Sequence, residues 1–189
     1  MSKVVTENVG KFSQHYPKTA VIVTASARGK DNAMTAAWHS SISINPPLYG
    51  VSISPERFTY QLITDSKEFG LNFIAWEKAS LAAWLGGTSA REIDKFERFG
   101  IEREKPLRTN VPILKDAYAA YECKLIDSKT YGDHIWFVGE IVAAHFLEEA
   151  FTSKKILDLN KIKPLLYLGL EGFYATADKD SLQFIKRGI

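Results

Sequence analysis

The sequence lacks several features that mark particular classes of protein. It has a single cysteine, Cys123, so no disulfide can form within the chain. No uncharged apolar run reaches the length of a membrane-spanning helix. Residues 1–7 lack the apolar centre of a secretory signal. Together these absences predict a protein of the reducing cytoplasm, with no membrane partner.

The chain also has little net charge. Its 24 basic and 22 acidic residues leave a net charge of +2, which gives no electrostatic reason to expect nucleic acid as a partner. Hydrophobic residues make up 46% of the 189 positions, enough for a sizeable buried core. We therefore expect one domain over residues 1–189, with a mostly polar tail over 178–189.

Three familiar site patterns are missing. No Gly-x-Gly-x-x-Gly follows a strand and no Walker-type loop occurs, which argues against a built-in dinucleotide fold. The four histidines do not pair at ligand spacing, so a structural zinc site is disfavoured. The Gly-x-Ser-x-Gly motif of many serine hydrolases is missing, so this class of enzyme is disfavoured.

Short apolar, β-branched segments dominate what is present. They predict strands over residues 19–25, 34–44, 48–54, 69–74, 117–127, 134–146 and near 165–174, with a turn over 28–32. Helical spacing predicts helices over 58–65, 77–85 and 89–99, the last capped by Ser89 with Glu92 as its capping-box partner. Because strands do not alternate with long helices, a doubly wound parallel sheet is disfavoured. The expected fold is mainly β with flanking helices.

The segment 135–146 is apolar on both faces. Ile135 and Phe137 share one face, and Trp136, Val138 and Val142 share the other. A barrel interior buries one face, so we expect the other to lie under a helix or against a second subunit.

Three segments are candidates for ligand binding. Residues 31–41 carry small and hydroxyl side chains, which let a flat ligand approach the backbone or simply pack beneath a neighbouring strand. Arg57 and Thr59 lie where a strand meets a helix, a place suited to phosphate and equally to an ordinary helix cap. The loop 86–91, with Lys95 one turn later, has the same two interpretations. Their combination favours a planar, phosphorylated ligand.

In their order and spacing, these segments resemble the flavin reductase-like, FMN-binding split-barrel family, in particular its flavoredoxin-type branch. The resemblance covers about residues 12–175. The matching segments are 32–43 with Pro46-Pro47, 49–53, 57–59 with Leu62-Ile63, 68–73, 89–96, Gly132-Asp133-His134 and 137–140.

The resemblance implies a Greek-key-like antiparallel barrel and a set of FMN contacts. The isoalloxazine edge would meet the backbone of Asn32, Ala33, Met34, Thr35 and Ala36, with Trp38 nearby. Ser52 and Ile53 would face the ribityl chain or the ring. The phosphate would be bound by Arg57, Thr59, Ser89, Arg91 and, less strongly, Lys95. Asn72 would belong to the same wall of the site.

The activity implied is flavin chemistry, with NADH or NADPH as a transient hydride donor. His134 is the candidate catalytic residue near the reacting face, or else an exposed turn histidine. The alternatives are an FMN electron carrier served by a redox partner protein, and an interaction domain that has lost its ligand. The family resemblance also implies a homodimer.

Overall fold

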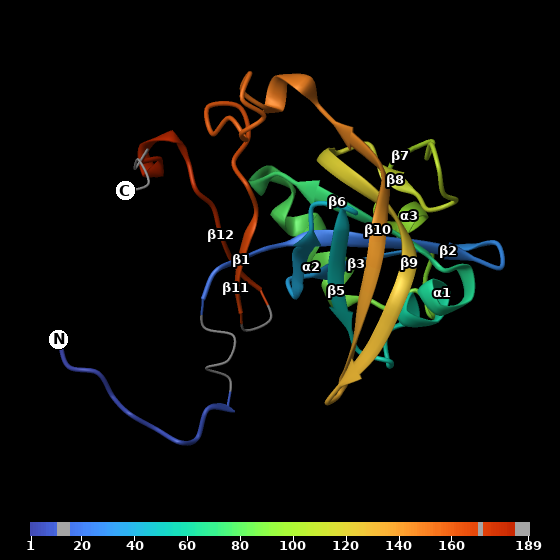
Figure 1. The fold of residues 1–189 in the computed structure, drawn as a ribbon, viewed down its shortest axis with the longest axis horizontal. Coiled ribbons are helices and arrows are strands. Elements are labelled where there is room, and N and C mark those ends of the chain that lie inside the picture. The colour runs from blue at the N-terminus through green and yellow to red at the C-terminus, as the bar shows by residue number, and fades with distance from the viewer. Residues whose placement is uncertain (11–15, 170–171, 184–189) are drawn as a thin grey trace.

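The computed structural model describes residues 1–10, 16–169 and 172–183. Its centre is a seven-stranded antiparallel sheet that curls into a barrel (Figure 1). The strand order is β3 (Lys30–Ala36), β2 (Val21–Ala27), β6 (Glu68–Ile74), β9 (Ala117–Tyr131), β10 (His134–Phe146), β5 (Leu48–Ile53) and β4 (His39–Ser43). This architecture confirms the expected mainly β barrel.

Helices and two small sheets surround the barrel. The helices are α1 (Phe58–Ser66), α2 (Ala79–Gly87) and α3 (Lys95–Arg98), with short 3-10 turns η2 (Trp76–Lys78), η3 (Glu148–Ala150) and η4 (Lys179–Ser181). A three-stranded sheet joins β1 (Lys18–Thr19), β11 (Leu166–Gly169) and β12 (Phe173–Ala175), and a two-stranded one joins β7 (Arg103–Glu104) and β8 (Ile113–Leu114). None of the helices in the described ranges is long and apolar enough to cross a membrane.

The strand expected over 34–44 is divided in two, so that prediction was wrong. β3 pairs with β2 and ends at Ala36, whereas β4 begins at His39 and pairs with β5. Between them the chain turns a corner, where the Trp38 carbonyl accepts a hydrogen bond from the Ser52 amide at 2.8 Å. An apolar pattern continues through such a corner, which is why sequence periodicity missed it.

Two further boundaries differ from expectation. The turn between β2 and β3 consists of only two residues, Arg28 and Gly29. Both have positive φ angles (53° and 72°), the backbone conformation that a tight two-residue hairpin requires. The single strand expected near 165–174 is instead two antiparallel strands, β11 and β12. The tail beyond residue 183 lies outside the described residues.

The helix expected over 89–99 is confined to α3. Its N-cap is Asp94, whose Oδ1 accepts from the amides of Phe96 (2.8 Å) and Glu97 (3.1 Å). Ser89 instead closes a tight turn, accepting from the Arg91 amide at 3.3 Å. The capping box expected at Ser89 was therefore wrong. A carboxylate five residues later caps the helix better because it accepts from two amides.

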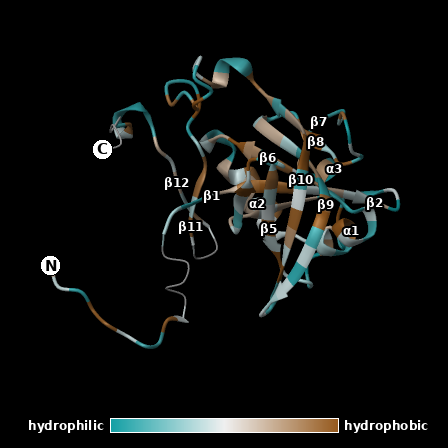
Figure 2. Ribbon diagram, in the orientation of Figure 1, coloured by the Kyte–Doolittle hydropathy of each residue, from teal (hydrophilic) through white to brown (hydrophobic). Residues whose placement is uncertain are grey.

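The core lies in two layers on either side of β2. One face of β2 packs inside the barrel with Val51, Phe69 and Phe137, closed at one end by α1. The other face, including Ile22, packs against α2 and α3 through a second apolar cluster. Residues 21–25 are consequently inaccessible to solvent on both faces. Figure 2 shows the hydrophobic colouring concentrated in these central elements.

Strand β10 alternates in burial. Ile135 and Phe137 are buried inside the barrel, whereas Trp136 and Val138 on the opposite face are only half-buried. β10 pairs with β9 and β5 along its edges, so it is not an edge strand. No described helix packs closely against this outer face. The covering that the sequence predicted is therefore not supplied by a described helix.

A buried carboxylate fastens the loop between β7 and β8 to the barrel. Glu122 on β9 is fully buried, and it accepts hydrogen bonds from the amides of Leu107, Arg108 and Thr109 at 2.7–2.8 Å. The Thr109 hydroxyl (2.8 Å) and His145 Nε2 (2.6 Å) complete the set. Burial alone would raise the pKa of Glu122, but the hydrogen bonds outweigh it and lower the pKa to about 2.

Candidate functional site

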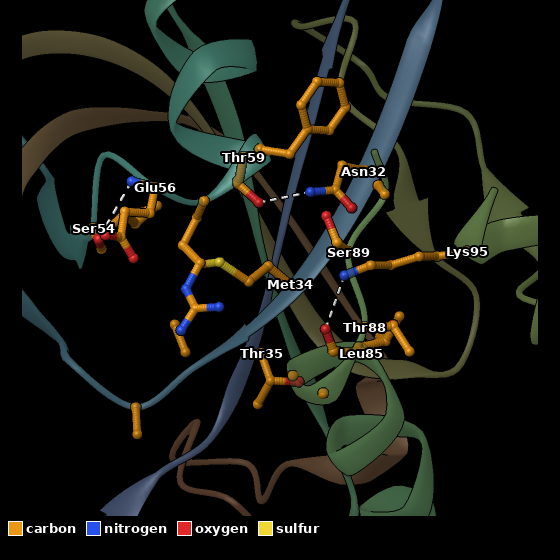
Figure 3. Close-up of a pocket in the computed structure, with 18 of the residues that line it drawn as sticks. Asn32, Met34, Thr35, Ser54, Glu56, Thr59, Leu85, Thr88, Ser89 and Lys95 are labelled. Atoms are coloured by element: carbon orange, nitrogen blue, oxygen red, sulfur yellow. Dashed lines mark hydrogen bonds between the residues drawn. The ribbon is translucent and has the colours of Figure 1, made fainter. Parts of the chain in front are cut away.

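A cavity of about 750 Å³ lies between β3, the β5–α1 junction and the loop that follows α2 (Figure 3). Its volume is in the range of small-molecule and cofactor sites. The structure brings most of the predicted site residues to its wall: Asn32, Met34, Thr35, Ala36, Trp38, Ser52, Ile53, Arg57, Thr59, Ser89, Arg91, Lys95 and His134. Segments from four parts of the chain thus meet at one site.

One end of the cavity is positively charged. Arg57 is the N-cap residue of α1, and its guanidinium has no hydrogen bond or ion pair to the rest of the described chain. Arg91 donates from Nη1 to the Glu56 carbonyl at 2.7 Å and lies over the Phe58 ring. Glu56 is the only acidic residue among the described residues of the lining. The positive charge of this region therefore exceeds the negative charge of the acidic residues in the lining, which suits an anionic ligand.

Lys95 supplies a buried cation in the same region. Its side chain is 3% exposed, and Nζ donates to the carbonyls of Ala33 and Leu85, both at 2.9 Å. Burial, and secondarily the neighbouring Arg57 guanidinium, lower the pKa of Lys95 to about 8. No described carboxylate forms an ion pair with this ammonium. A buried charge held only by neutral carbonyls is stabilised further by an anion in the cavity.

An unpaired buried acceptor also points to a ligand. Asn32 is 2% exposed, and its Nδ2 donates to Thr59 Oγ1 at 2.8 Å. Its Oδ1 has no hydrogen-bond partner in the described structure. Buried polar atoms are nearly always paired, so Oδ1 calls for a group that the protein does not provide. The site thus combines excess cations with an unpaired hydrogen-bond acceptor, which fits an anionic ligand that also carries a hydrogen-bond donor, as does the phosphorylated flavin that the resemblance implies.

Aromatic side chains form another part of the cavity wall. The ring centroids of Trp38 and His134 lie 4.7 Å apart at 43°. Tyr167 and Tyr174, from β11 and β12, pack together at 5.5 Å and also line the cavity. His134 Nδ1 lies 2.7 Å from an exposed Asp133 carboxylate, and this contact lowers the pKa of Asp133. Such a wall offers flat surfaces to a planar ligand.

Two predicted residues lie outside the lining. Ala33 is buried beneath it and contributes only the carbonyl that holds Lys95. Asn72 is fully buried between strands, donating to the Ile22 carbonyl (3.1 Å) and Thr24 Oγ1 (3.2 Å). Its Oδ1 accepts from the Leu114 amide at 2.9 Å. Because its polar atoms are already engaged within the core, Asn72 is a structural residue rather than part of the cavity wall.

Sequence reasoning missed several lining residues. Tyr167 and Tyr174 lie far along the chain, and no local pattern indicates that their hairpin reaches the cavity. Phe58 was assigned to a helix without a ligand role. The Gly86–Thr88 loop was identified as a possible phosphate loop, and it does line the cavity.

Most of the chain matches one known protein family. The model of the flavin reductase like domain matches residues 13–175. The chain belongs to this family. An FMN-binding protein from Thermus thermophilus, solved with bound 1-cyclohex-2-enone, is 34% identical and superposes with a TM-score of 0.85, covering 98% of this chain and 99% of that one. The flavoredoxin of Methanosarcina acetivorans, 24% identical, has the same fold with a TM-score of 0.84 over 100% and 97% of the two chains.

Proteins of two archaea are also similar to this chain in sequence. An uncharacterized protein of Aeropyrum pernix is 34% identical over 82% of this chain, which spans 58% of that protein's length. A ferric-chelate reductase (NAD(P)H) of Archaeoglobus fulgidus is 28% identical over 68% of this chain and 76% of its own.

Proposed function

We propose that this protein binds FMN in the cavity and passes a hydride from NADH or NADPH to it. The observation that carries the proposal is that one cavity is lined both by cations that the described residues do not neutralise and by aromatic side chains. FMN carries the two matching groups, a phosphate and a planar ring. The NAD(P)H-dependent ferric-chelate reductase among the relatives supports the choice of donor.

The protein's own residues position the reactants. FMN, when bound, supplies the hydride-accepting chemistry. Arg57, Arg91 and Lys95 hold the phosphate, while Met34, Thr35 and Ala36 border the ring. Trp38 and His134 flank the ring end, where a nicotinamide has to stack at contact distance. The cavity wall thus fixes the distance and orientation on which hydride transfer depends.

Anaerobic spectroscopy tests the proposal. Protein loaded with oxidised FMN absorbs visible light. Addition of NADH or NADPH is expected to reduce the FMN and so to remove this absorbance. The control is the same titration with NAD(P)⁺. FMN that binds but stays oxidised with both donors would contradict nicotinamide-dependent reduction and support an electron carrier. Absence of FMN binding would overturn the whole proposal.

His134→Ala is expected to slow reduction of bound FMN by NAD(P)H about tenfold or more, the lower range for a positioned polar side chain. FMN affinity should stay unchanged, because His134 is not one of the cations proposed to hold the phosphate. Single-turnover reduction and an FMN titration measure the two effects. Asp133→Asn is the matched control and should have a smaller effect. If His134→Ala left reduction intact, the catalytic role would be dropped.

FMN affinity is expected to fall as the pH rises from about 7 to about 9. The pKa of Lys95 lies near 8, so its positive charge is present below that pH and is lost above it. Phosphate binding favours the charged form, hence binding weakens when the proton leaves. FMN titrations across this range measure the effect, and Lys95→Met should remove most of the pH dependence. An equally steep profile in that variant would exclude Lys95 as its source.

We also propose that the protein is a homodimer. Trp136, Val138 and Val142 are half-buried on the outer face of β10, where they flank the exposed Glu140, and no described helix packs closely against this face. On the projecting three-stranded sheet, Leu168 and Phe173 are exposed. A second copy would bury both surfaces. Light scattering at micromolar concentration should give twice the 21.2 kDa chain mass, whereas a monomer mass with FMN bound would contradict the dimer.

A further inference from the structure

A second hollow of about 700 Å³ lies beside the first cavity, and we call it the Trp136 groove. It is bordered by β1, by the corner between β3 and β4, and by strands β5 and β10. Ala37, Trp38 and Ser52 line both hollows, so the two share a wall. Lys18 and Trp136 line only the groove. Its volume is in the range of small-molecule sites, and its own residues allow it to be tested separately from the first cavity.

The indole of Trp136 lies across β5 because Gly50 has no side chain. A Cβ at Gly50 would lie 2.7 Å from Trp136 Nε1, closer than such atoms approach each other. Ser40 pairs with Gly50, and Ser52 pairs with Trp136, so only short side chains stand beside the indole. Trp136 is half-buried, and its Nε1 donates no hydrogen bond within the described part of the chain. The groove therefore offers a flat aromatic surface with a free N–H donor.

Lys18 gives the groove a positive charge. Its Nζ lies 4.6 Å from the centre of the Tyr16 ring and 5.5 Å from that of the Trp38 ring. Lys18 forms no ion pair with any described residue, and none of the described residues that line the groove is acidic. Aromatic rings attract a cation without neutralising it. The charge of Lys18 therefore favours an anion in the groove.

His39 contributes no second charge. Its Nε2 lies 2.7 Å from the Thr19 carbonyl oxygen, which only accepts hydrogen bonds, so Nε2 carries a proton. Burial lowers the pKa of His39, which favours the neutral ring, and Nδ1 then accepts from the Tyr49 hydroxyl at 2.8 Å. Lys18 is thus the single cation among the described residues of the lining. One cation suits a carboxylate, whereas phosphate sites typically use arginine forks or a helix N-terminus.

We propose that the Trp136 groove is a second ligand site, which binds a planar aromatic carboxylate. The ring of this ligand lies against the Trp136 indole, and its carboxylate approaches the Lys18 ammonium. The site does not depend on FMN, because neither residue lines the first cavity. Trp136 also belongs to the β10 surface that the proposed homodimer would cover. A second copy of the chain is therefore the competing occupant of the groove.

Three small ligands test what the groove recognises. Benzoate is planar and negatively charged, benzamide is planar and neutral, and cyclohexanecarboxylate is charged but not planar. Isothermal titration calorimetry measures their binding to the full-length protein, both free of FMN and saturated with it. Benzoate should bind about tenfold more tightly than either of the others, because each of them lacks one of the two contacts. FMN should not displace it.

Two substitutions locate the binding. Lys18→Met should weaken benzoate binding about tenfold, the lower range for a hydrogen bond to a charged group. Trp136→Leu should weaken it about fivefold, through loss of the ring contact. Both variants should keep the FMN affinity of the wild type. Lys30→Met is the matched control, because Lys30 also lies over an aromatic ring, Phe58 at 6.0 Å, but lines neither hollow. Thermal unfolding and light scattering establish the fold and the assembly of each variant.

Four results would overturn the site. Benzamide binding as tightly as benzoate would show that charge is not recognised. Displacement of benzoate by FMN, without any effect of Lys18→Met, would place the probe in the first cavity. Failure of the wild type to bind benzoate would reject the site, and a dimer that Trp136→Leu dissociates would then assign the groove to the second copy. Tighter binding of adenosine monophosphate through Lys18 and Trp136 would assign it to a nucleotide. Absence of FMN binding would refute only the proposed function.

Discussion

Replacing Arg57 and Arg91 together by alanine is expected to weaken FMN binding by about a hundredfold, while riboflavin affinity changes by less than about twofold. Charge-assisted hydrogen bonds contribute roughly 1.5–3 kcal/mol each, and both arginines are partly exposed, so the lower value applies to each. Arg57→Ala alone should cost about tenfold. Riboflavin lacks the phosphate and so does not depend on these cations. Fluorescence titration of both flavins measures the effect.

Arg28→Ala is the matched control for this pair. Arg28 is also an exposed arginine, but its guanidinium pairs with Asp65 away from the cavity. Its removal should leave both flavin affinities unchanged. Unchanged FMN affinity in the double variant would remove Arg57 and Arg91 from the phosphate site. An equal loss of FMN and riboflavin affinity would mean that the substitutions disturb the cavity rather than the phosphate contact.

Glu122→Ala is expected to lower the free energy of unfolding by about 3–5 kcal/mol, the usual effect of breaking a buried, hydrogen-bonded charge network. The substitution strands the amides of Leu107, Arg108 and Thr109, which the carboxylate now satisfies. Urea denaturation followed by circular dichroism measures it. Glu68→Ala is the control, because Glu68 binds the same loop through Asn110 but in a more exposed setting. Equal losses in the two variants would contradict a special role for the buried carboxylate.

The same network predicts an acid transition. The pKa of Glu122 is lowered from 4.5 to about 2 in the folded protein. Its contribution to stability is therefore complete above pH 4.5 and is lost as the pH falls towards 2, because the unfolded chain binds the proton first. In Glu122→Gln the stability should depend less on pH in this window. A profile unchanged from wild type would assign the acid transition to other carboxyls.

The sequence predicted the barrel because its strands are short, apolar and bounded by turns. Strand β2 and the β9–β10 hairpin follow directly from that pattern. The corner at Trp38 did not, since hydrophobicity continues through it while the pairing partner changes. The capping of α3 by Asp94 was hidden by an equally good local signal at Ser89.

The candidate site was predicted where neighbouring residues form it. Segments 32–38 and 57–59 combine residue types that suit a phosphorylated planar ligand, and both line the cavity. Asn72 resembled them in type, but its alternation along β6 directs it into the core. The contributions of Tyr167 and Tyr174 depend on how the last hairpin folds back, which only the three-dimensional structure reveals.

The most direct test of the central claim is a titration of the wild-type protein, freed of ligand, with FMN and with riboflavin. Phosphate recognition by Arg57, Arg91 and Lys95 predicts that FMN binds about a hundredfold more tightly than riboflavin. The preference should shrink at high ionic strength, because the arginines are partly exposed. Equal affinities for the two flavins would contradict the account.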